Sequence, residues 1–171
     1  MNAEELSVLS KSAIPEAAKN LSKKDVAFLV ETLSEKDDAL RYNAFLLLQA
    51  NSRLAPETYT HWSTLQGKLG SANSYQRSLG LMLLAENVRW DKEGKFRNVI
   101  DSYLNCCVDE KFITARQAIQ GLARVIEATD SYNDKIKHGL NSLDFSKYKE
   151  NQQSLLKKDV AAILKLLDKK R

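Results

Sequence analysis

The fold is decided by one stretch of sequence, Arg77-Ser78-Leu79-Gly80-Leu81-Met82-Leu83-Leu84. A basic residue leads into small and leucine-like residues, and the segment after Ser78 is apolar around nearly the whole circumference of a helix. Such a helix is usually buried on all sides, because no face is left for water. The stretch therefore predicts a central helix enclosed by other helices.

Three other segments repeat this pattern, and they cover residues 41–48, 116–123 and 158–164. The basic residues that open the four segments, Arg41, Arg77, Arg116 and Lys158, lie 36, 39 and 42 positions apart. A drifting period near 40 residues is typical of repeated helical hairpins joined by loops of unequal length. Each segment is then the second helix of a hairpin, and neighbouring hairpins must stack to share a core.

The first helix of each hairpin is visible in apolar spacing of the type i, i+3, i+4, i+7, which marks one buried stripe. The clearest stripe contains Phe96, Val99, Ile100, Tyr103 and Cys107, and it predicts that the Cys107 thiol is buried. Three further stripes define the other first helices: Val26, Leu29, Val30 and Leu33; Tyr59, Trp62, Leu65 and Leu69; and Ile136, Leu140 and Leu143.

The division of the chain follows from these helices and from the polar breaks between them. We expect one domain over residues 1–171, with a helical N-terminal cap in residues 1–20. Four hairpins follow, at about residues 22–52, 53–90, 94–129 and 132–170. Ser22 with Asp25 and Ser34 with Asp37 have the spacing of helix N-terminal caps, so we expect a helix to begin at each serine.

Composition favours an all-α fold. The chain is 43% hydrophobic and 28% charged, but it has only 6 glycines and 2 prolines, too few for the turns of a β-sandwich or barrel. We expect more than about 65% helix, well above the average of globular proteins, and no sheet. The apolar runs are much shorter than the ~20 residues of a membrane span, so no membrane segment is expected.

The arrangement resembles HEAT and armadillo-type helical repeat proteins. The residues that carry the resemblance are the basic residues followed three places later by a small one: Arg41 with Ala44, Arg77 with Gly80 and Lys158 with Ala161. The resemblance implies a right-handed α-α superhelix of about four hairpins. HEAT units usually place an aspartate in the turn before the arginine, where the two form a ladder between repeats; in this chain Asp37 or Asp38 could fill that role in the first unit only.

Catalytic and metal-binding patterns are absent from the sequence. It has no nucleophile elbow, zinc-protease, phosphate-loop or dinucleotide-binding motif. Cys106 and Cys107 are adjacent, and His61 and His138 lie far from them, so the spacing of a zinc site is missing. We expect no metal, no cofactor and no catalysis, and the two thiols are typical of a reducing cytoplasm.

One enzyme class shares this architecture, the HEAT-like DNA glycosylases, which use tryptophans and a carboxylate in a basic cleft. The chain contains Trp62, Trp90 and Asp91. The family pattern would place an aspartate one helical turn after a tryptophan, and here those positions hold Gln66 and Gly94. The stripe around Trp62 predicts a core residue, and Trp90, which lies next to a turn, is expected to anchor a loop.

A binding surface is expected on the second helices, which line the inner face of such a stack. Aligning the units places Ser78, Leu81 and Ala85 between two outer groups of residues. The candidate partner-binding residues are Tyr42, Leu46, Gln49, Gln117, Gln120 and Arg124. Two interpretations stay open: the N-terminal segment covers the apolar part, or it forms a groove for a protein partner or a second copy of the chain.

Charge is concentrated in the last third. Residues 111–171 contain thirteen basic and seven acidic side chains, a balance of +6, whereas residues 1–55 and 56–110 each balance at −1. Lys157, Lys158 and Lys165 are the candidates for a basic patch that binds nucleic acid. The alternative is a solvated outer face on the terminal unit. The sequence thus predicts a protein-binding scaffold first and a nucleic-acid-binding protein second.

Overall fold

The computed structural model describes residues 1–170. In that part of the chain 76% of residues are helical and there are no strands, which confirms the predicted all-α fold class. The helices alternate with short connections, several of which are single 3₁₀ turns. The ten α-helices are α1 (Ala3–Ser7), α2 (Ile14–Ala17), α3 (Lys23–Thr32), α4 (Asp38–Ser52), α5 (Trp62–Gly67), α6 (Ser74–Asn87), α7 (Ile100–Asn105), α8 (Phe112–Ala128), α9 (Asn133–Asn141) and α10 (Glu150–Lys169).

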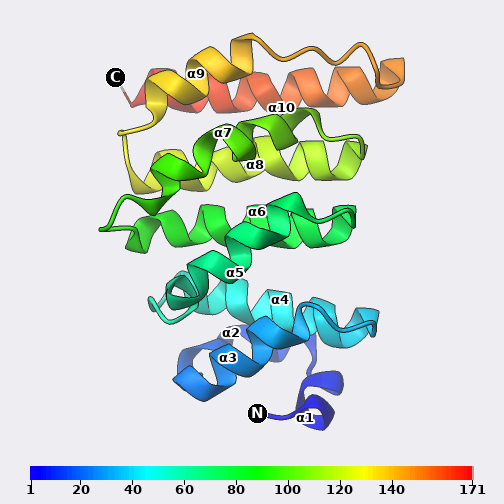
Figure 1. The fold of residues 1–171 in the computed structure, drawn as a ribbon, viewed down its shortest axis with the longest axis vertical. Helices are drawn as coiled ribbons and strands as arrows, with labels where there is room; N and C mark the ends of the chain where they lie inside the picture. Colours follow the sequence, from blue (N-terminus) through cyan, green and yellow to red (C-terminus); the bar gives the residue numbers. More distant parts are fainter. Residues whose placement is uncertain (171) are drawn as a thin grey trace.

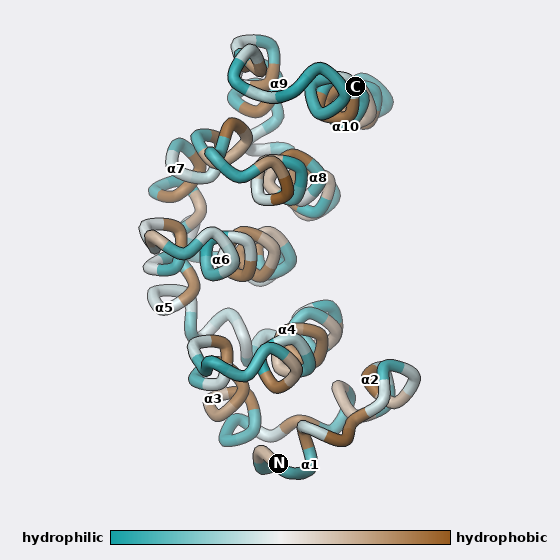
Figure 2. The backbone as a smooth tube through the Cα atoms, turned by 90° about the vertical axis from the view of Figure 1, so that its right-hand side faces the viewer, coloured by the Kyte–Doolittle hydropathy of each residue, from teal (hydrophilic) through white to brown (hydrophobic). Residues whose placement is uncertain are grey.

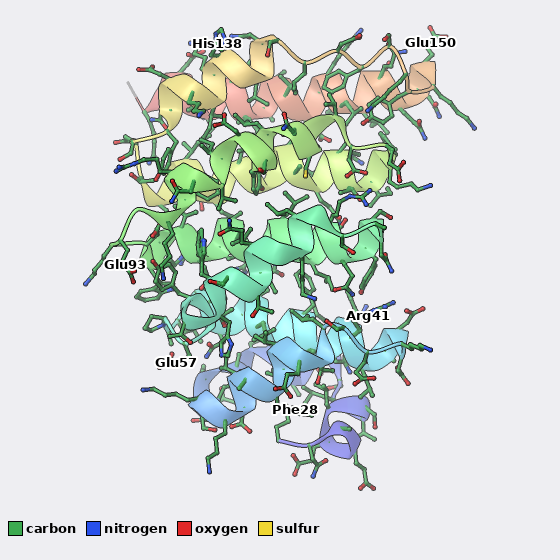
Figure 3. All side chains as sticks on the ribbon, viewed as in Figure 1. Phe28, Arg41, Glu57, Glu93, His138 and Glu150 are labelled. Carbon is green, nitrogen blue, oxygen red and sulfur yellow. The ribbon has the colours of Figure 1, made fainter. Side chains whose placement is uncertain are left out.

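The helices form two layers (Figures 1 and 2). The longer helices α4, α6, α8 and α10 lie one above the other, run in the same direction and make up one layer, and α3, α5, α7 and α9 make up the other. Each long helix packs against the next, α4 on α6, α6 on α8 and α8 on α10. We call α4, α6, α8 and α10 the long-helix layer. Its helices all begin at the edge of the stack where Figure 3 labels Arg41 and Glu150.

The helix starts follow local capping chemistry. Ser22 and Asp25 form a capping box at the start of α3, in which each side chain accepts a hydrogen bond from the other's backbone N–H, as expected from the sequence. The start predicted at Ser34 is wrong. The Ser34 N–H donates to Glu31 O and so closes α3, and Asp37 caps α4 instead, because its Oδ1 accepts from Ala39 N and Leu40 N at 2.9 Å each.

The core lies between the two layers. All five residues of the Phe96–Cys107 stripe are buried, as predicted, and so are Ile119 and Leu122 of α8. Helix α6 is largely enclosed: nine of its fourteen residues are buried, and it packs against α4, α5 and α8. The close approach of α5 to α6 requires a glycine: a Cβ on Gly80 would lie 2.9 Å from the carbonyl oxygen of Leu65.

The N-terminal segment covers part of α4. Helices α1 and α2 pack against α4 at one end of the stack, where Figure 2 shows α2 beside α4. Two asparagines of α4 bind this segment: Asn43 Nδ2 donates to Leu6 O of α1 at 2.9 Å, and Asn51 Nδ2 donates to Ala18 O, in the turn after α2, at 3.0 Å. The segment therefore covers the end of the stack, and the side of α4 that carries Tyr42 stays exposed.

Candidate functional site

A groove of about 740 Å³ crosses the long-helix layer. It runs over the middle turns of α4 and the first turns of α6 and α8. Helix α10 contributes one lining residue, Gln152. We call this hollow the groove, and its lining is Tyr42, Phe45, Leu46, Gln49, Ser74, Tyr75, Ser78, Leu79, Met82, Lys111, Phe112, Ile113, Thr114, Gln117 and Gln152. Most of these side chains are apolar or aromatic.

Four of the six candidate partner-binding residues line the groove, namely Tyr42, Leu46, Gln49 and Gln117. The other two lie farther along the same helices and are engaged with neighbours. Gln120 Nε2 donates to Asp159 Oδ1 at 3.2 Å, and Arg124 Nη1 donates to Glu127 Oε2 at 2.7 Å. These two residues are not part of the groove lining.

The expectation that Ser78, Leu81 and Ala85 of α6 face the groove is only partly right. Ser78 lines the groove, but Leu81 and Ala85 are buried, and Met82 takes the place expected for Leu81. Ala85 is buried because α8 approaches it closely: a Cβ on Gly121 would lie 3.6 Å from the Ala85 Cβ. The residue alignment could not show which side of α6 its two neighbours cover.

Sequence reasoning missed two apolar residues that matter for the groove, Tyr75 and Ile113. Ile113 is 59% exposed, Tyr42 39% and Tyr75 36%, so one large, exposed apolar side chain from each of three helices lines the same hollow. Tyr75 and Ile113 lie in the first turn of α6 and α8, ahead of the arginine used to align the units. Their one signal in the sequence is an apolar side chain between the helix cap and the arginine, and that signal does not show whether the side chain packs inward or faces a groove.

Cations lie against the aromatic rings of the groove. The Arg41 guanidinium stacks 4.3 Å from the centre of the Tyr75 ring, and Lys11 Nζ lies 5.2 Å from the centre of the Tyr42 ring. Arg41 also pairs with Asp38 one turn earlier. Lys111 is the charged residue of the lining itself. The two cation–ring contacts hold the Tyr42 and Tyr75 rings at the edge of the groove.

Two of the three opening arginines, Arg77 and Arg116, join successive units through carboxylates. Arg41 pairs with Asp38 of its own helix. Arg77 pairs with Asp109, in the turn before α8, and Arg116 Nε pairs with Asp159 Oδ2 of α10 at 2.6 Å. Asp38 thus does pair with the arginine of the first unit, but within one helix. The pairs that cross between units use Asp109 and Asp159, which do not occupy the position four residues before the basic one.

A second row of charges crosses the same helices beyond the groove. The buried carboxylate of Glu86 on α6 accepts from Arg53 Nη2 at 2.7 Å, where Arg53 follows the end of α4. Arg124 Nε of α8 lies 3.5 Å from the same Oε1 atom, and Arg89 Nη2 lies 3.6 Å from Oε2. We call these four residues the Glu86 cluster. They connect the C-terminal parts of three long helices.

The three lysines of the predicted basic patch lie on α10. Lys157, Lys158 and Lys165 are all exposed, and none lines the groove. Lys158 and Lys165 are seven residues apart and share one face of the helix, whereas Lys157 is rotated by about 100° from Lys158. The structure brings the lysines to one helix but not into the groove.

The tryptophans pack within the fold, and both thiols are buried. Trp62 is buried in the core, and Trp90 Nε1 donates to Ser52 O at 2.7 Å across the unit boundary. The Asp91 carboxylate accepts from Tyr59 Oη at 2.8 Å and from two backbone N–H groups. Burial raises the pKa of Cys106 to about 11 and that of Cys107 to about 12. Both thiols are therefore protonated at neutral pH.

Among residues 1–170, no group of three or more histidine, cysteine or acidic side chains is placed to hold a metal ion. Within the same range no helix combines the length and apolarity needed to cross a bilayer. Comparisons with protein families, with curated proteins and with solved structures find no match to this chain.

Proposed function

We propose that the protein is a non-catalytic, cytoplasmic scaffold of the HEAT-like type, a right-handed α-α superhelix, that binds a linear segment of a partner protein in the groove. The observation that carries the proposal is the convergence of Tyr42, Tyr75 and Ile113, three exposed apolar side chains from three different helices, on one hollow. Contiguous apolar surface of this kind is uncommon unless another molecule covers it.

The composition of the lining supports a peptide-like occupant. Tyrosine, phenylalanine and methionine are enriched where protein interfaces bury surface, because they offer large areas with few rotatable bonds or adapt their shape. The groove holds Tyr42, Tyr75, Phe112 and Met82. Its polar groups, among them Gln49, offer hydrogen bonds that would orient a backbone or a polar side chain. An amphipathic helix laid across α4, α6 and α8 would use both features.

The test is a selection of random 16-residue peptides displayed on phage against the immobilised protein. The enriched peptides are then measured against the Tyr42→Asp/Ile113→Asp variant, in which two carboxylates face the occupant. Because both side chains are exposed, the variant should keep its helical circular-dichroism spectrum while the affinity of the peptides falls at least about tenfold. Val8→Asp is the matched control, since Val8 is 79% exposed and lies outside the groove.

Peptides that bind the double variant as well as the unchanged protein would overturn the groove as the binding site. Sedimentation of the two proteins completes the test. If the unchanged protein forms dimers that the double variant does not form, the occupant of the groove is a second copy of the chain.

Nucleic-acid binding is the second candidate, and the exposure of Lys157, Lys158 and Lys165 on α10 favours it. Phosphate contacts make affinity fall steeply with salt, whereas an apolar groove is comparatively indifferent. Changing the three lysines to glutamate should abolish the binding of a labelled 20-nucleotide DNA at low salt. The same change should leave the affinity of the selected peptides intact, which separates the two functions.

A further inference from the structure

The lining of the groove carries one charge that no carboxylate of the lining balances. Lys111 is the one charged residue of the lining, and no carboxylate lines the hollow. At the edge where the long helices begin, Lys11 and Arg41 lie over the Tyr42 and Tyr75 rings. Arg41 has Asp38 as its partner, but Lys11 and Lys111 have no ion pair among the described residues. Asp37, Glu110 and Glu150 lie at the same edge, but none of them lines the hollow, and Glu110 is 3.6 Å from Arg77. Lys11 and Lys111 are therefore the cations of this rim that can pair with an occupant.

Three arginines gather at the opposite rim. Arg53 lies four residues after Gln49, and Glu86 lies four after Met82, so both fall on the helix faces that line the groove, one turn farther along. Arg124 lies seven residues, two turns, after Gln117. The Glu86 cluster joins these positions and carries three guanidinium groups, which share two carboxylates, Glu86 and the exposed Glu127. One positive charge is left over.

We propose that the partner segment is an acidic amphipathic one: its apolar side chains fill the groove and its carboxylates flank them on both sides, facing Lys11 and Lys111 at one rim and Arg53 and Arg124 at the other. This inference rests on the proposed function, since it assumes that the groove binds a peptide. An apolar stripe alone would give affinity with little selectivity. The cations at both rims would favour acidic segments and repel basic ones, because charge complementarity acts mainly on specificity and on the rate of association.

The experiment is a displayed library with a fixed apolar stripe of leucine, phenylalanine and methionine and with the flanking positions varied among glutamate, glutamine and lysine. It is selected on the unchanged protein at low and at moderate salt. Peptides that depend on the groove are those lost on the Tyr42→Asp/Ile113→Asp variant. Among them, glutamate should exceed lysine at the flanking positions by about two- to fivefold at low salt, the ratio expected of one exposed ion pair. The excess should shrink at moderate salt, because exposed charges are screened.

The charge-reversal variant Lys111→Glu should remove or invert the preference for glutamate at one end of the peptides. Lys24→Glu is the matched control, because Lys24 is an exposed lysine of α3 in the other helix layer. Groove-dependent peptides without an acidic excess, or with the same excess on Lys111→Glu, would overturn the inference and leave the groove as a peptide site. A selection that yields no groove-dependent peptide would overturn both proposals. Binding of a single-stranded 20-nucleotide DNA that is lost in Lys111→Glu but not in Lys24→Glu would assign these cations to nucleic acid and overturn the inference as well.

Discussion

Arg77 and Asp109 hold two neighbouring long helices together through a pair of parallel hydrogen bonds. Arg77 Nε donates to Asp109 Oδ2 at 2.7 Å, and Arg77 Nη2 donates to Oδ1 at 2.8 Å. Both side chains are largely buried, and Oδ1 also accepts from the Lys111 N–H at 2.8 Å. The pair thus fixes the turn before α8 against the start of α6, at the edge of the groove.

Changing Asp109 to asparagine should destabilise the protein by about 3 to 5 kcal/mol, since it leaves the Arg77 guanidinium buried without its counter-charge. Urea denaturation followed by circular dichroism measures the loss. Glu110→Gln is the control, because Glu110 lies 3.6 Å from the same guanidinium but is mostly exposed. Its loss should be below about 1 kcal/mol. Equal losses in the two variants would show that the Arg77–Asp109 contact has no special strength.

The same pair predicts a dependence on pH. Burial disfavours the charged form of Asp109, but the hydrogen bonds from Arg77 and the Lys111 N–H more than offset it, so the pKa lies below its usual 3.8. A carboxylate with a lowered folded-state pKa stabilises the protein above its unfolded pKa, and the stabilisation is lost as the pH falls through the folded pKa. The difference in stability between the unchanged protein and Asp109→Asn should therefore be constant near neutral pH and shrink below about pH 4. A difference that grows on acidification would contradict the assignment.

The core around α8, the second helix of the third hairpin, should be sensitive to side-chain truncation. Ile119 and Leu122 have no exposed surface and lie in α8, which has a long helix on either side. Changing either to alanine should lower the free energy of unfolding by about 2 to 5 kcal/mol. Ile113→Ala in the same helix is the control, and its cost should stay well below that range because the side chain is exposed.

The contact of α5 with α6 should be broken by a single methyl group. A Cβ on Gly80 would lie 2.9 Å from both Leu65 O and Lys68 Cβ, so Gly80→Ala must push two helices apart. A loss of roughly 1 to 3 kcal/mol is expected from such overpacking. Gly67 has no atom within 4 Å of the same position, and Gly67→Ala should leave the stability unchanged or raise it slightly. Thermal melts of the two variants measure this difference: the melting temperature should fall for Gly80→Ala and stay the same or rise slightly for Gly67→Ala.

Much of the fold could be predicted from the sequence, because burial imposes a period that the residues themselves display. The stripe through Phe96 and Cys107 and the enclosure of α6 are of this kind. The cap at Asp37 could not be predicted, since Ser34 has the same local chemistry and only the backbone bond to Glu31 shows that it ends α3. Asp109 was missed because a loop of different length displaces it along the chain.

The candidate site, too, could be predicted from the sequence only in part. Tyr42 and Leu46 could be identified from one helix, because their exposed face follows from its apolar pattern. Tyr75 and Ile113 required the neighbouring helices, since nothing local distinguishes an apolar residue in a first turn that packs inward from one that faces a groove. The position of the Glu86 cluster required three helices at once.

The Glu86 cluster predicts an asymmetry between the two partners of one ion pair. The Glu86 side chain is 3% exposed, whereas Arg53 is 47% exposed, so the two residues respond differently when the other is removed. In Glu86→Gln the three arginines can turn toward water, and the amide still accepts a hydrogen bond, so a loss of about 1 kcal/mol is expected. In Arg53→Met the buried carboxylate keeps only the longer contacts to Arg89 and Arg124, and the loss should rise to about 2 to 3 kcal/mol. Urea denaturation of both variants at low and at high salt decides the matter. If Glu86→Gln were the more damaging change, repulsion among the arginines rather than burial of the carboxylate would control this part of the long-helix layer.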